Sequence, residues 1–209
     1  MRRGKAKKGD LIAIYADESC LGNGREGENP GGAGGVIEWL HPKSNQVERY
    51  DYWISDPATT NNRMALRSLI EALREISRRG NTYKVLFTSD SKYIVEGMKS
   101  WVGPWIERGW KRKGGPIENL ELWKEAVAAA SPHEIDFRWV AGHAGHPQNE
   151  YANFLATRAA AEQSNSGGLR QSEYESWVEK QKGTRVRLRD PSPFPDAQSF
   201  RPIKRTWTT

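Results

Sequence analysis

Short apolar runs alternate with amphipathic segments along most of the chain. Residues 11–17, LIAIYAD, form an apolar run that ends in a carboxylate, a pattern typical of a buried central strand. Residues 33–40 and 47–54 are two further strand-like segments, joined by the turn-forming sequence HPKSN. We expect these three strands to pair in order as an antiparallel sheet.

A helical pattern follows the third strand. Apolar residues from Leu66 to Ile76 recur at helical spacing, and Thr59 or Thr60 can cap the first turn. Gly80 is placed to end the helix. The segment therefore predicts a capped amphipathic helix with an unusually polar first turn.

The next apolar run, residues 83–90, predicts a second buried strand that ends in Asp90. Ser91 follows directly and can cap a helix that reaches about Lys99. A strand, a helix and a strand in this order predict a parallel crossover, which places the two buried strands side by side.

The second half of the chain continues the alternation of strands and helices. Residues 101–123 combine tryptophans with basic residues, and Pro104 and several glycines prevent one continuous helix there. Residues 118–130 predict another helix and residues 134–140 the last strand. The sequence AGHAGHPQNE then leads into a final helix with alanines along one face.

A change in composition after Gln163 divides the chain. We expect a basic tail at residues 1–9, one globular domain at residues 10–163 and an extension at residues 164–209 that begins with a short linker. In the extension, an amphipathic patch of Tyr174, Trp177 and Val178 is expected to dock on the domain. The sequence TRVRLR, residues 184–189, would suit an added edge strand.

The charge balance favours a polyanionic partner. Lys and Arg total 32 against 26 Asp and Glu, giving a net charge of +6 and a pI near 9.4. Because Cys20 is the one cysteine, an internal disulfide framework and a Cys-rich zinc site are excluded. No apolar run approaches the roughly 20 residues that span a bilayer. We expect a cytoplasmic protein that has no membrane partner.

Two of the predicted buried strands end in an aspartate, Asp17 and Asp90. If the strands are parallel neighbours, the two carboxylates converge at the carboxyl end of the sheet. Converging carboxylates repel each other unless a cation lies between them, so convergence implies a hard divalent metal, Mg²⁺ or Mn²⁺. On the residues alone, each aspartate could instead cap the turn that follows it.

Four short blocks occur in order along the chain: Asp17, TNNRM at residues 60–64, TSDS at 88–91, and GHAGHP at 142–147 followed by Asn149 and Glu150. At these blocks the chain resembles bacterial-type ribonuclease H type 1, over about residues 10 to 162. The resemblance implies an α/β (α+β mixed) ribonuclease H-like fold with a five-stranded mixed sheet flanked by helices. It also implies a monomer that hydrolyses the RNA strand of RNA/DNA hybrids with Mg²⁺ or Mn²⁺.

The resemblance also implies roles for individual residues. Asp17 and Asp90 would be direct ligands of the metal, and His143 would assist proton transfer or product departure. Amide side chains would contact 2′-hydroxyls and base edges, and a protrusion rich in tryptophan and basic residues would grip the phosphates of the DNA strand. The nucleic-acid-binding set is Asn23, Asn61, Asn62 and Gln148 for the amides, with Trp101, Lys111, Arg112 and Lys113 for the protrusion.

The chain departs from the family pattern at two metal ligands. The family has glutamate after TNNRM and aspartate in the last helix, where this chain has Ala65 and Asn153. An amide oxygen can still coordinate a hard cation, whereas alanine cannot. We hypothesise that Glu18 takes over part of the role of the missing glutamate, with Asn153 as a weaker ligand. On an ideal strand, however, Asp17 and Glu18 point to opposite faces, which argues against compensation unless the strand end or a bulge redirects one.

Two alternatives to a rearranged nuclease remain open. The replacements at positions 65 and 153 could be a deliberate inactivation, or the chain could be a natural hybrid-binding protein that has lost catalysis. We favour a nuclease, because His143 in its glycine-flanked loop serves turnover more than affinity. An integrase-like transferase of similar fold is a weaker candidate, because the GHAGHP loop and the basic protrusion point away from it.

Overall fold

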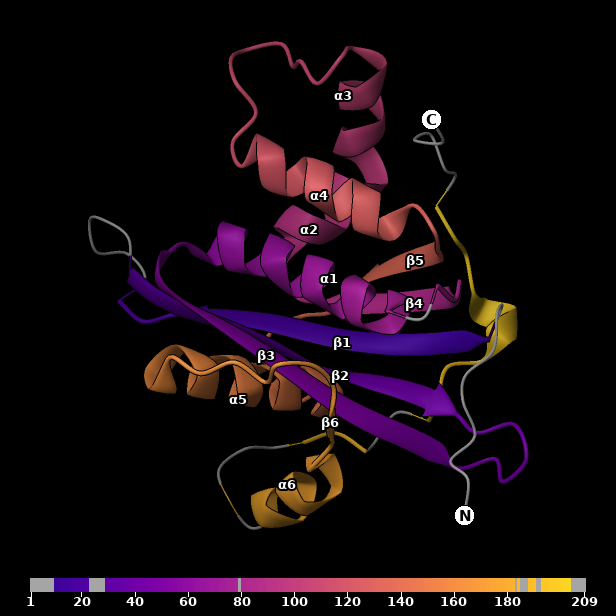
Figure 1. Ribbon diagram of the computed structural model, residues 1–209. Helices are drawn as coiled ribbons and strands as arrows, with labels where there is room; N and C mark the ends of the chain where they lie inside the picture. The colour runs from indigo at the N-terminus through magenta and orange to yellow at the C-terminus, as the bar shows by residue number, and fades with distance from the viewer. Residues whose placement is uncertain are drawn as a thin grey trace.

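The computed structural model describes residues 10–22, 29–78, 80–182, 184, 188–190 and 193–203. Its centre is a six-stranded sheet in the order β5-β4-β1-β2-β3-β6 (Figure 1). In chain order the strands are β1 (Leu11–Cys20), β2 (Asn29–Leu40), β3 (Val47–Thr59), β4 (Lys84–Ser89), β5 (Glu134–Trp139) and β6 (Arg170–Gln171). The basic tail at residues 1–9 lies outside the described residues.

The pairing of the strands confirms the mixed α/β class. β1, β2 and β3 form the expected antiparallel run, and β4 pairs in parallel with both β1 and β5. The sheet has one strand more than the five expected. The additional strand, β6, is a two-residue segment of the C-terminal extension that pairs with Tyr50 and Asp51 of β3. A pair of residues is too short to show strand periodicity in the sequence.

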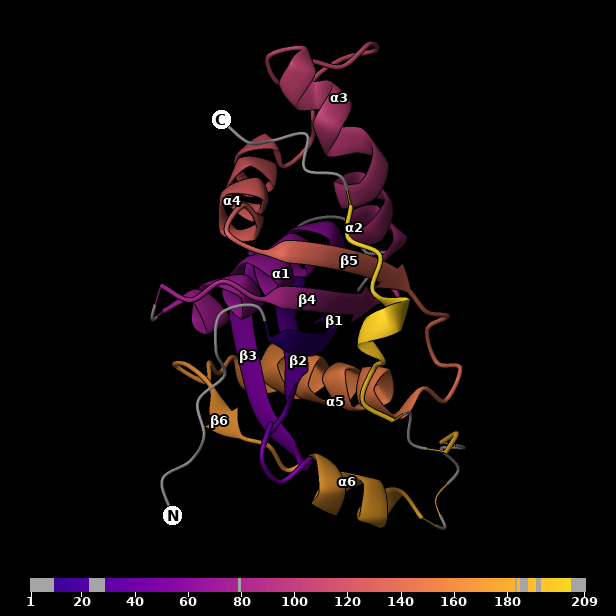
Figure 2. The ribbon, with the colours of Figure 1, turned by 90° about the vertical axis from the view of Figure 1, so that its right-hand side faces the viewer.

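Helices cover both faces of the sheet (Figure 2). On one side lie α1 (Asn61–Ser77), α2 (Lys92–Glu96), the π-helical turn η1 (Gly97–Trp101), α3 (Val102–Glu107) and α4 (Leu120–Ala130). On the other side lie α5 (Pro147–Glu162) and α6 (Tyr174–Gln181), and a short 3₁₀ helix, η2 (Ala197–Ser199), follows in the C-terminal segment. No helix among the described residues is long and apolar enough to cross a membrane.

The expected capping of α1 is confirmed. Thr60 is the N-cap, and its side-chain oxygen accepts a hydrogen bond from the backbone N–H of Arg63. The apolar face of the helix, including Leu66, Leu69 and Leu73, is fully buried against the sheet. The cap and the buried face together fix the register in which the TNNRM residues enter the first turn.

The helix after β4 is longer than expected. The helical run continues through Pro104 to Glu107, where the sequence predicted an end near Lys99. The π-helical turn η1 precedes the proline. Its backbone hydrogen bonds join residues that are five apart, and this wider spacing tolerates a residue without an N–H. Gly97, at the start of this turn, is needed for packing, because a Cβ there would lie 2.1 Å from the Trp123 ring.

Alternate residues of β1 pack on opposite faces of the sheet. Ile12, Ile14 and Ala16 belong to the core on the α1 side, whereas Ala13 and Tyr15 belong to a second core on the α5 side. The same alternation places Asp17 on the α5 side and Glu18 on the α1 side. The two acidic side chains therefore leave β1 on opposite faces of the sheet.

The amphipathic patch of the extension docks as expected. Tyr174 and Trp177 of α6 are buried in the second core, with ring centroids 5.5 and 5.2 Å from that of Tyr151 in α5. The edge strand expected at residues 184–189 lies partly outside the described residues. The residues described there, 184, 188 and 189, are not in a strand.

Candidate active site

The carboxylates of Asp17 and Asp90 converge at the carboxyl ends of β1 and β4. The two strands are parallel neighbours in which Ala16 pairs with Ser89, so the next residue of each chain segment lies at the same edge of the sheet. Asp17, Glu18 and Asp90 each offer a carboxylate oxygen, and these oxygens all lie within 4.8 Å of one another. The convergence expected of the two aspartates is therefore observed.

Glu18 joins this cluster from the opposite face of β1. Asp17 accepts a hydrogen bond of 3.3 Å from the side-chain amide of Asn149 in α5, whereas Glu18 is hydrogen-bonded to the side chain of Ser91 at the start of α2. No bulge redirects Glu18, since the pairing of β1 with β2 runs unbroken through this position.

The opposite faces of Asp17 and Glu18, which argued against compensation, do not keep the two carboxylates apart. Asp90 follows the last residue of β4, so it lies beyond the sheet and can be reached from either side. The longer side chain of Glu18 then reaches the same space as the carboxylate of Asp17.

Burial and neighbouring negative charge disfavour ionisation at this cluster. Burial, followed by the charges of Asp90 and Glu18, raises the pKa of Asp17 to about 9. Burial and then Asp90 raise the pKa of Glu18 to about 8, and burial also raises the pKa of Asp90. A set of oxygen ligands that is costly to ionise without a cation fits a hard divalent metal ion.

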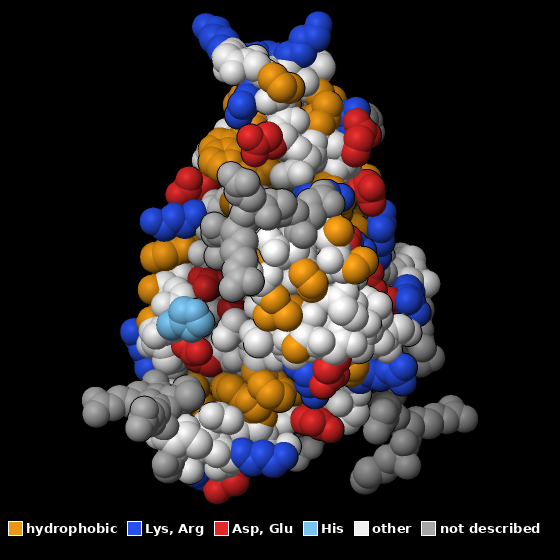
Figure 3. All heavy atoms as spheres, turned by 90° about the vertical axis from the view of Figure 1, so that its left-hand side faces the viewer, with side chains coloured by type: hydrophobic (Ala, Val, Ile, Leu, Met, Phe, Trp, Pro, Cys, Tyr) orange, Lys and Arg blue, Asp and Glu red, His pale blue; other side chains and the backbone are white. Residues whose placement is uncertain are grey.

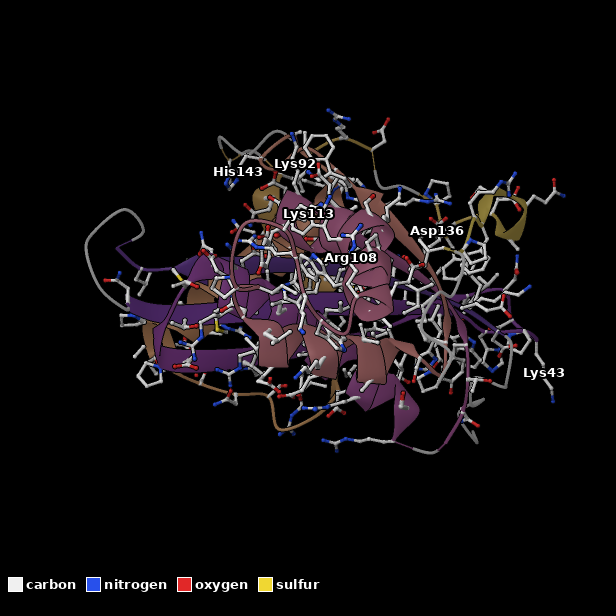
Figure 4. The ribbon with its side chains drawn as sticks, turned by 90° about the horizontal axis from the view of Figure 1, so that it is seen from above. Lys43, Lys92, Arg108, Lys113, Asp136 and His143 are labelled. Carbon is white, nitrogen blue, oxygen red and sulfur yellow. The ribbon has the colours of Figure 1, made fainter. Side chains whose placement is uncertain are left out.

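His143 lies in the loop between β5 and α5. Its side chain is 78% exposed, and its Nδ1 lies 3.8 Å from Oε2 of Glu150. In Figure 4, His143 lies at the outer edge of the molecule, on the same side as Lys92 of α2. Gly142, the preceding residue, allows the loop to approach the carboxylates, because a Cβ there would lie 2.3 Å from Oδ2 of Asp90.

Glu150 is a fourth acidic residue at this site. Its place in the motif was expected, but no role was predicted for it. Its Oε1 accepts a hydrogen bond from the backbone N–H of Gly145, and its charge contributes to the raised pKa of both Asp17 and Asp90. The sequence feature that could have identified Glu150 is its place in the first turn of α5, directly after the histidine loop.

The two replaced positions lie in different environments. Ala65 is buried in the core on the α1 side, the side from which Glu18 enters the cluster. Asn153 lies in the wall of a groove between α5 and α6, near Glu150 and Trp177. The amide that contacts Asp17 directly is that of Asn149. The sequence placed Asn149 in the motif, but no contact with a carboxylate was predicted for it.

The amides expected to contact nucleic acid differ in their accessibility. Asn61 and Asn62 open α1, half-buried and exposed respectively, and Asn23 lies outside the described residues. Gln148 is fully buried and donates a hydrogen bond to Glu38, so in this structure its amide is not accessible to a nucleic acid. Burial of Gln148 follows from its position on the face of α5 that packs against the sheet.

The basic protrusion extends beyond the body of the molecule. Lys111, Arg112 and Lys113 are exposed in the loop after α3, and Lys and Arg side chains gather at this end in Figure 3. Trp101 is half-buried, with its ring against those of Tyr93, Trp105 and Trp123. The tryptophan therefore packs the protrusion onto the body and leaves the cations free to face solvent.

Comparisons with known proteins agree with this arrangement. A family model for RNase H matches residues 9–161. The ribonuclease H of Shewanella sp. (strain ANA-3) is 44% identical over 155 residues, which cover 74% of this chain and 89% of that protein. The ribonuclease H of Stutzerimonas stutzeri (strain A1501) is 37% identical over 154 residues, which cover 73% of this chain and 93% of that protein.

A solved structure matches the chain beyond the family domain. It is described as the crystal structure of "LC9-RNase H1, a type 1 RNase H with the type 2 active-site motif", with 57% identity and a TM-score of 0.87. The match covers 96% of this chain and 95% of that chain, and so it includes most of the C-terminal extension. By its family model, its relatives and its fold, the chain belongs to the RNase H family.

Proposed function

We propose that the protein is an endoribonuclease that hydrolyses the RNA strand of RNA/DNA hybrids with Mg²⁺ or Mn²⁺. The observation that carries the proposal is the convergence of Asp17, Glu18 and Asp90 at the carboxyl ends of parallel strands. Family membership and the names of the relatives support the reaction and its substrate.

Glu18 replaces the glutamate that the family carries at the position of Ala65. The face of β1 from which Glu18 projects is the face covered by α1, where a glutamate at position 65 would lie. A glutamate on β1 can therefore supply, from the sheet side of α1, the carboxylate that is missing at position 65. The similarity to a type 1 RNase H described as having the type 2 active-site motif supports a rearranged set of carboxylates.

The metal-binding residues in this proposal are Asp17, Glu18 and Asp90, with Asn153 as a weaker ligand. When bound, divalent cations supply the positive charge that activates water and stabilises the leaving oxygen. Asn149 holds Asp17 in place through its amide, and Ser91 does the same for Glu18. These bonds fix the direction of both carboxylates before substrate arrives.

His143 acts on protons or on product at the edge of the site. Its ring is exposed, and Glu150 lies close enough to orient it. A histidine near neutral pH can accept and release a proton within one cycle. Asn61 and Asn62 contact the minor groove of the hybrid, and Lys111, Arg112 and Lys113 contact phosphates of the DNA strand.

An exchange of the glutamate between strand and helix tests the proposal. The parent protein is incubated with a labelled RNA/DNA hybrid over a range of Mg²⁺ and Mn²⁺ concentrations. Glu18→Ala should lower kcat by about 100-fold or more, as removal of a charged catalytic group does. When Ala65→Glu is added to that variant, much of the activity should return. The new glutamate on α1 would place a carboxylate beside Asp17 and Asp90 again.

Two results would separate the alternatives. Cleavage by Glu18→Ala at the parental rate would refute the role of Glu18 while leaving the nuclease intact. A salt-sensitive complex with hybrid and no cleavage by the parent, at any cation concentration, would favour a hybrid-binding protein without catalysis. The absence of carboxylates at Ala65 and Asn153 is the observation that favours this second candidate.

A further inference from the structure

The C-terminal segment after α6 reaches the loop that carries His143. The backbone N–H of Arg189 donates a hydrogen bond of 2.8 Å to the carbonyl oxygen of Gly145. On either side of Arg189, Leu188 and Phe194 pack against the buried core beneath the sheet. The contact is therefore flanked by two side chains that are themselves packed.

Both ends of this segment are anchored on the sheet. At one end, α6 is tied to β3 by an ion pair of 2.6 Å between Glu175 and Arg49. At the other end, the backbone N–H of Ile203 donates to the carbonyl oxygen of Ile135 in β5, and that of Arg201 donates to Asp136. Figure 2 shows the described residues 193–203 passing the end of α5 and continuing along β5.

The histidine loop contains one residue with a strained backbone. His143 has a φ of 51°, in the left-handed region that is costly for a residue with a side chain, whereas Gly145, with a φ of 79°, adopts this region without that cost. The peptide N–H of Gly145 is held by Glu150 of α5, and its carbonyl is held by Arg189. Gly145 is thus clamped by one hydrogen bond from the domain and one from the C-terminal segment.

We infer that Arg189 is a positioning residue for His143 and that it acts through its backbone N–H. The inference rests on the proposed role of His143 in hybrid cleavage. The bond lies two residues from His143 and does not touch the three carboxylates, so its loss should affect turnover more than binding of the hybrid. Because Arg189 lies beyond residues 9–161, this support comes from outside the part of the chain that matches the family model.

Two substitutions at one position test the inference. Arg189→Pro removes the N–H donor, whereas Arg189→Ala removes the side chain and keeps the donor. We expect Arg189→Pro to lower kcat by about tenfold, the equivalent of one hydrogen bond, with KM within about twofold of the parent. Arg189→Ala should stay within about twofold of the parent in both parameters.

A double-mutant cycle separates positioning of His143 from general support of the fold. If Arg189 acts through His143, Arg189→Pro should lower kcat no further in a His143→Ala background. Losses that multiply in the double variant, or equal kcat values for the Pro and Ala variants, would overturn the inference. Leu188→Ala removes a packed side chain next to Arg189 without changing the backbone donors. It should also lower kcat, but by less than Arg189→Pro does.

Hydrogen exchange provides a readout that needs no turnover. Amides of residues 140–146 should exchange faster in Arg189→Pro than in Arg189→Ala, while amides of β4 exchange at the same rate in both. Unchanged exchange in the loop would overturn the inference even if the protein cleaves hybrid. If the parent does not cleave hybrid but the loop still exchanges faster in Arg189→Pro than in Arg189→Ala, the proposed function has failed and the contact between Arg189 and Gly145 still supports the loop.

Discussion

A single side chain, Glu18, adds a third carboxylate to the space shared by Asp17 and Asp90. Its pKa is raised from 4.5 to about 8, so between these values the folded protein holds a proton that the unfolded chain releases. Stability from this group is complete below the lower value and is lost as the pH rises through the upper one. Without a cation, the site therefore destabilises the fold at neutral and alkaline pH.

Glu18→Gln should make the metal-free protein more stable while it lowers activity. We expect its Tm at pH 8 to exceed that of the parent, and the difference to vanish near pH 4.5. Relief of about 1 kcal/mol of the cost of burying this charge beside Asp90 raises the Tm of a chain of this size by roughly 2–4 °C. Thermal unfolding in a chelating buffer across this pH range measures the effect.

Glu121→Gln serves as the control, because Glu121 is an exposed acidic residue on α4. Its Tm should follow that of the parent at every pH. Addition of Mg²⁺ should raise the Tm of the parent more than that of Glu18→Gln. Equal Tm values for the parent and Glu18→Gln throughout the pH range would contradict the raised pKa of Glu18.

The positions of single side chains could be predicted only in part from the sequence. Asp17 and Asp90 could be paired, because the ends of parallel neighbouring strands must meet. Glu18 could be named as a substitute for the missing glutamate. Its approach to the other two carboxylates could not be settled, because strand alternation places it on the opposite face and the position of Asp90 beyond the end of β4 depends on the fold. Of the neighbours Gln148 and Asn149, the first was the predicted contact with nucleic acid. The second contacts Asp17, because packing on the sheet sets the rotation of α5.

At the scale of elements, the protrusion after α3 is the main candidate for nonspecific affinity. Replacing Lys111, Arg112 and Lys113 together by Ala should raise KM for the hybrid and leave kcat nearly unchanged. The slope of log Kd against log salt concentration should fall by up to about 2.7, because each lost phosphate contact contributes about 0.9. Titrations of hybrid binding at several salt concentrations measure this slope.

Lys43→Ala is a suitable comparison for this experiment. Lys43 is exposed in the turn between β2 and β3, on the side of the molecule away from His143 (Figure 4). This variant should bind hybrid with the parental salt dependence. A triple variant with the parental slope would show that the protrusion does not contact phosphates.

Most elements could be predicted from their periodicity, with two exceptions that have physical causes. The continuation of the helical run through Pro104 was not predicted. A proline indicates the end of a helix unless the π-helical turn before it is known. Strand β6 was missed because it exists only through its partner β3 and has no pattern of its own. Local sequence determines the regular elements, whereas tertiary contacts determine these two.

At the scale of the whole molecule, the extension is part of the folded unit. Removal of residues 166–209 takes away Tyr174 and Trp177, two buried aromatic side chains of the second core. At about 2–3 kcal/mol for each buried aromatic side chain, we expect the Tm to fall by roughly 10 °C or more. Trp177→Ala alone should lower it by a smaller amount, and an unchanged Tm after truncation would contradict the docking.

The path of the extension has one more consequence. Its residues cover β3 on one border of the sheet through β6, and contact β5 on the other border through Ile203. Unprotected outer strands offer free backbone groups that recruit strands from other molecules. Because the extension occupies part of both borders, we expect its removal to expose backbone groups that favour self-association.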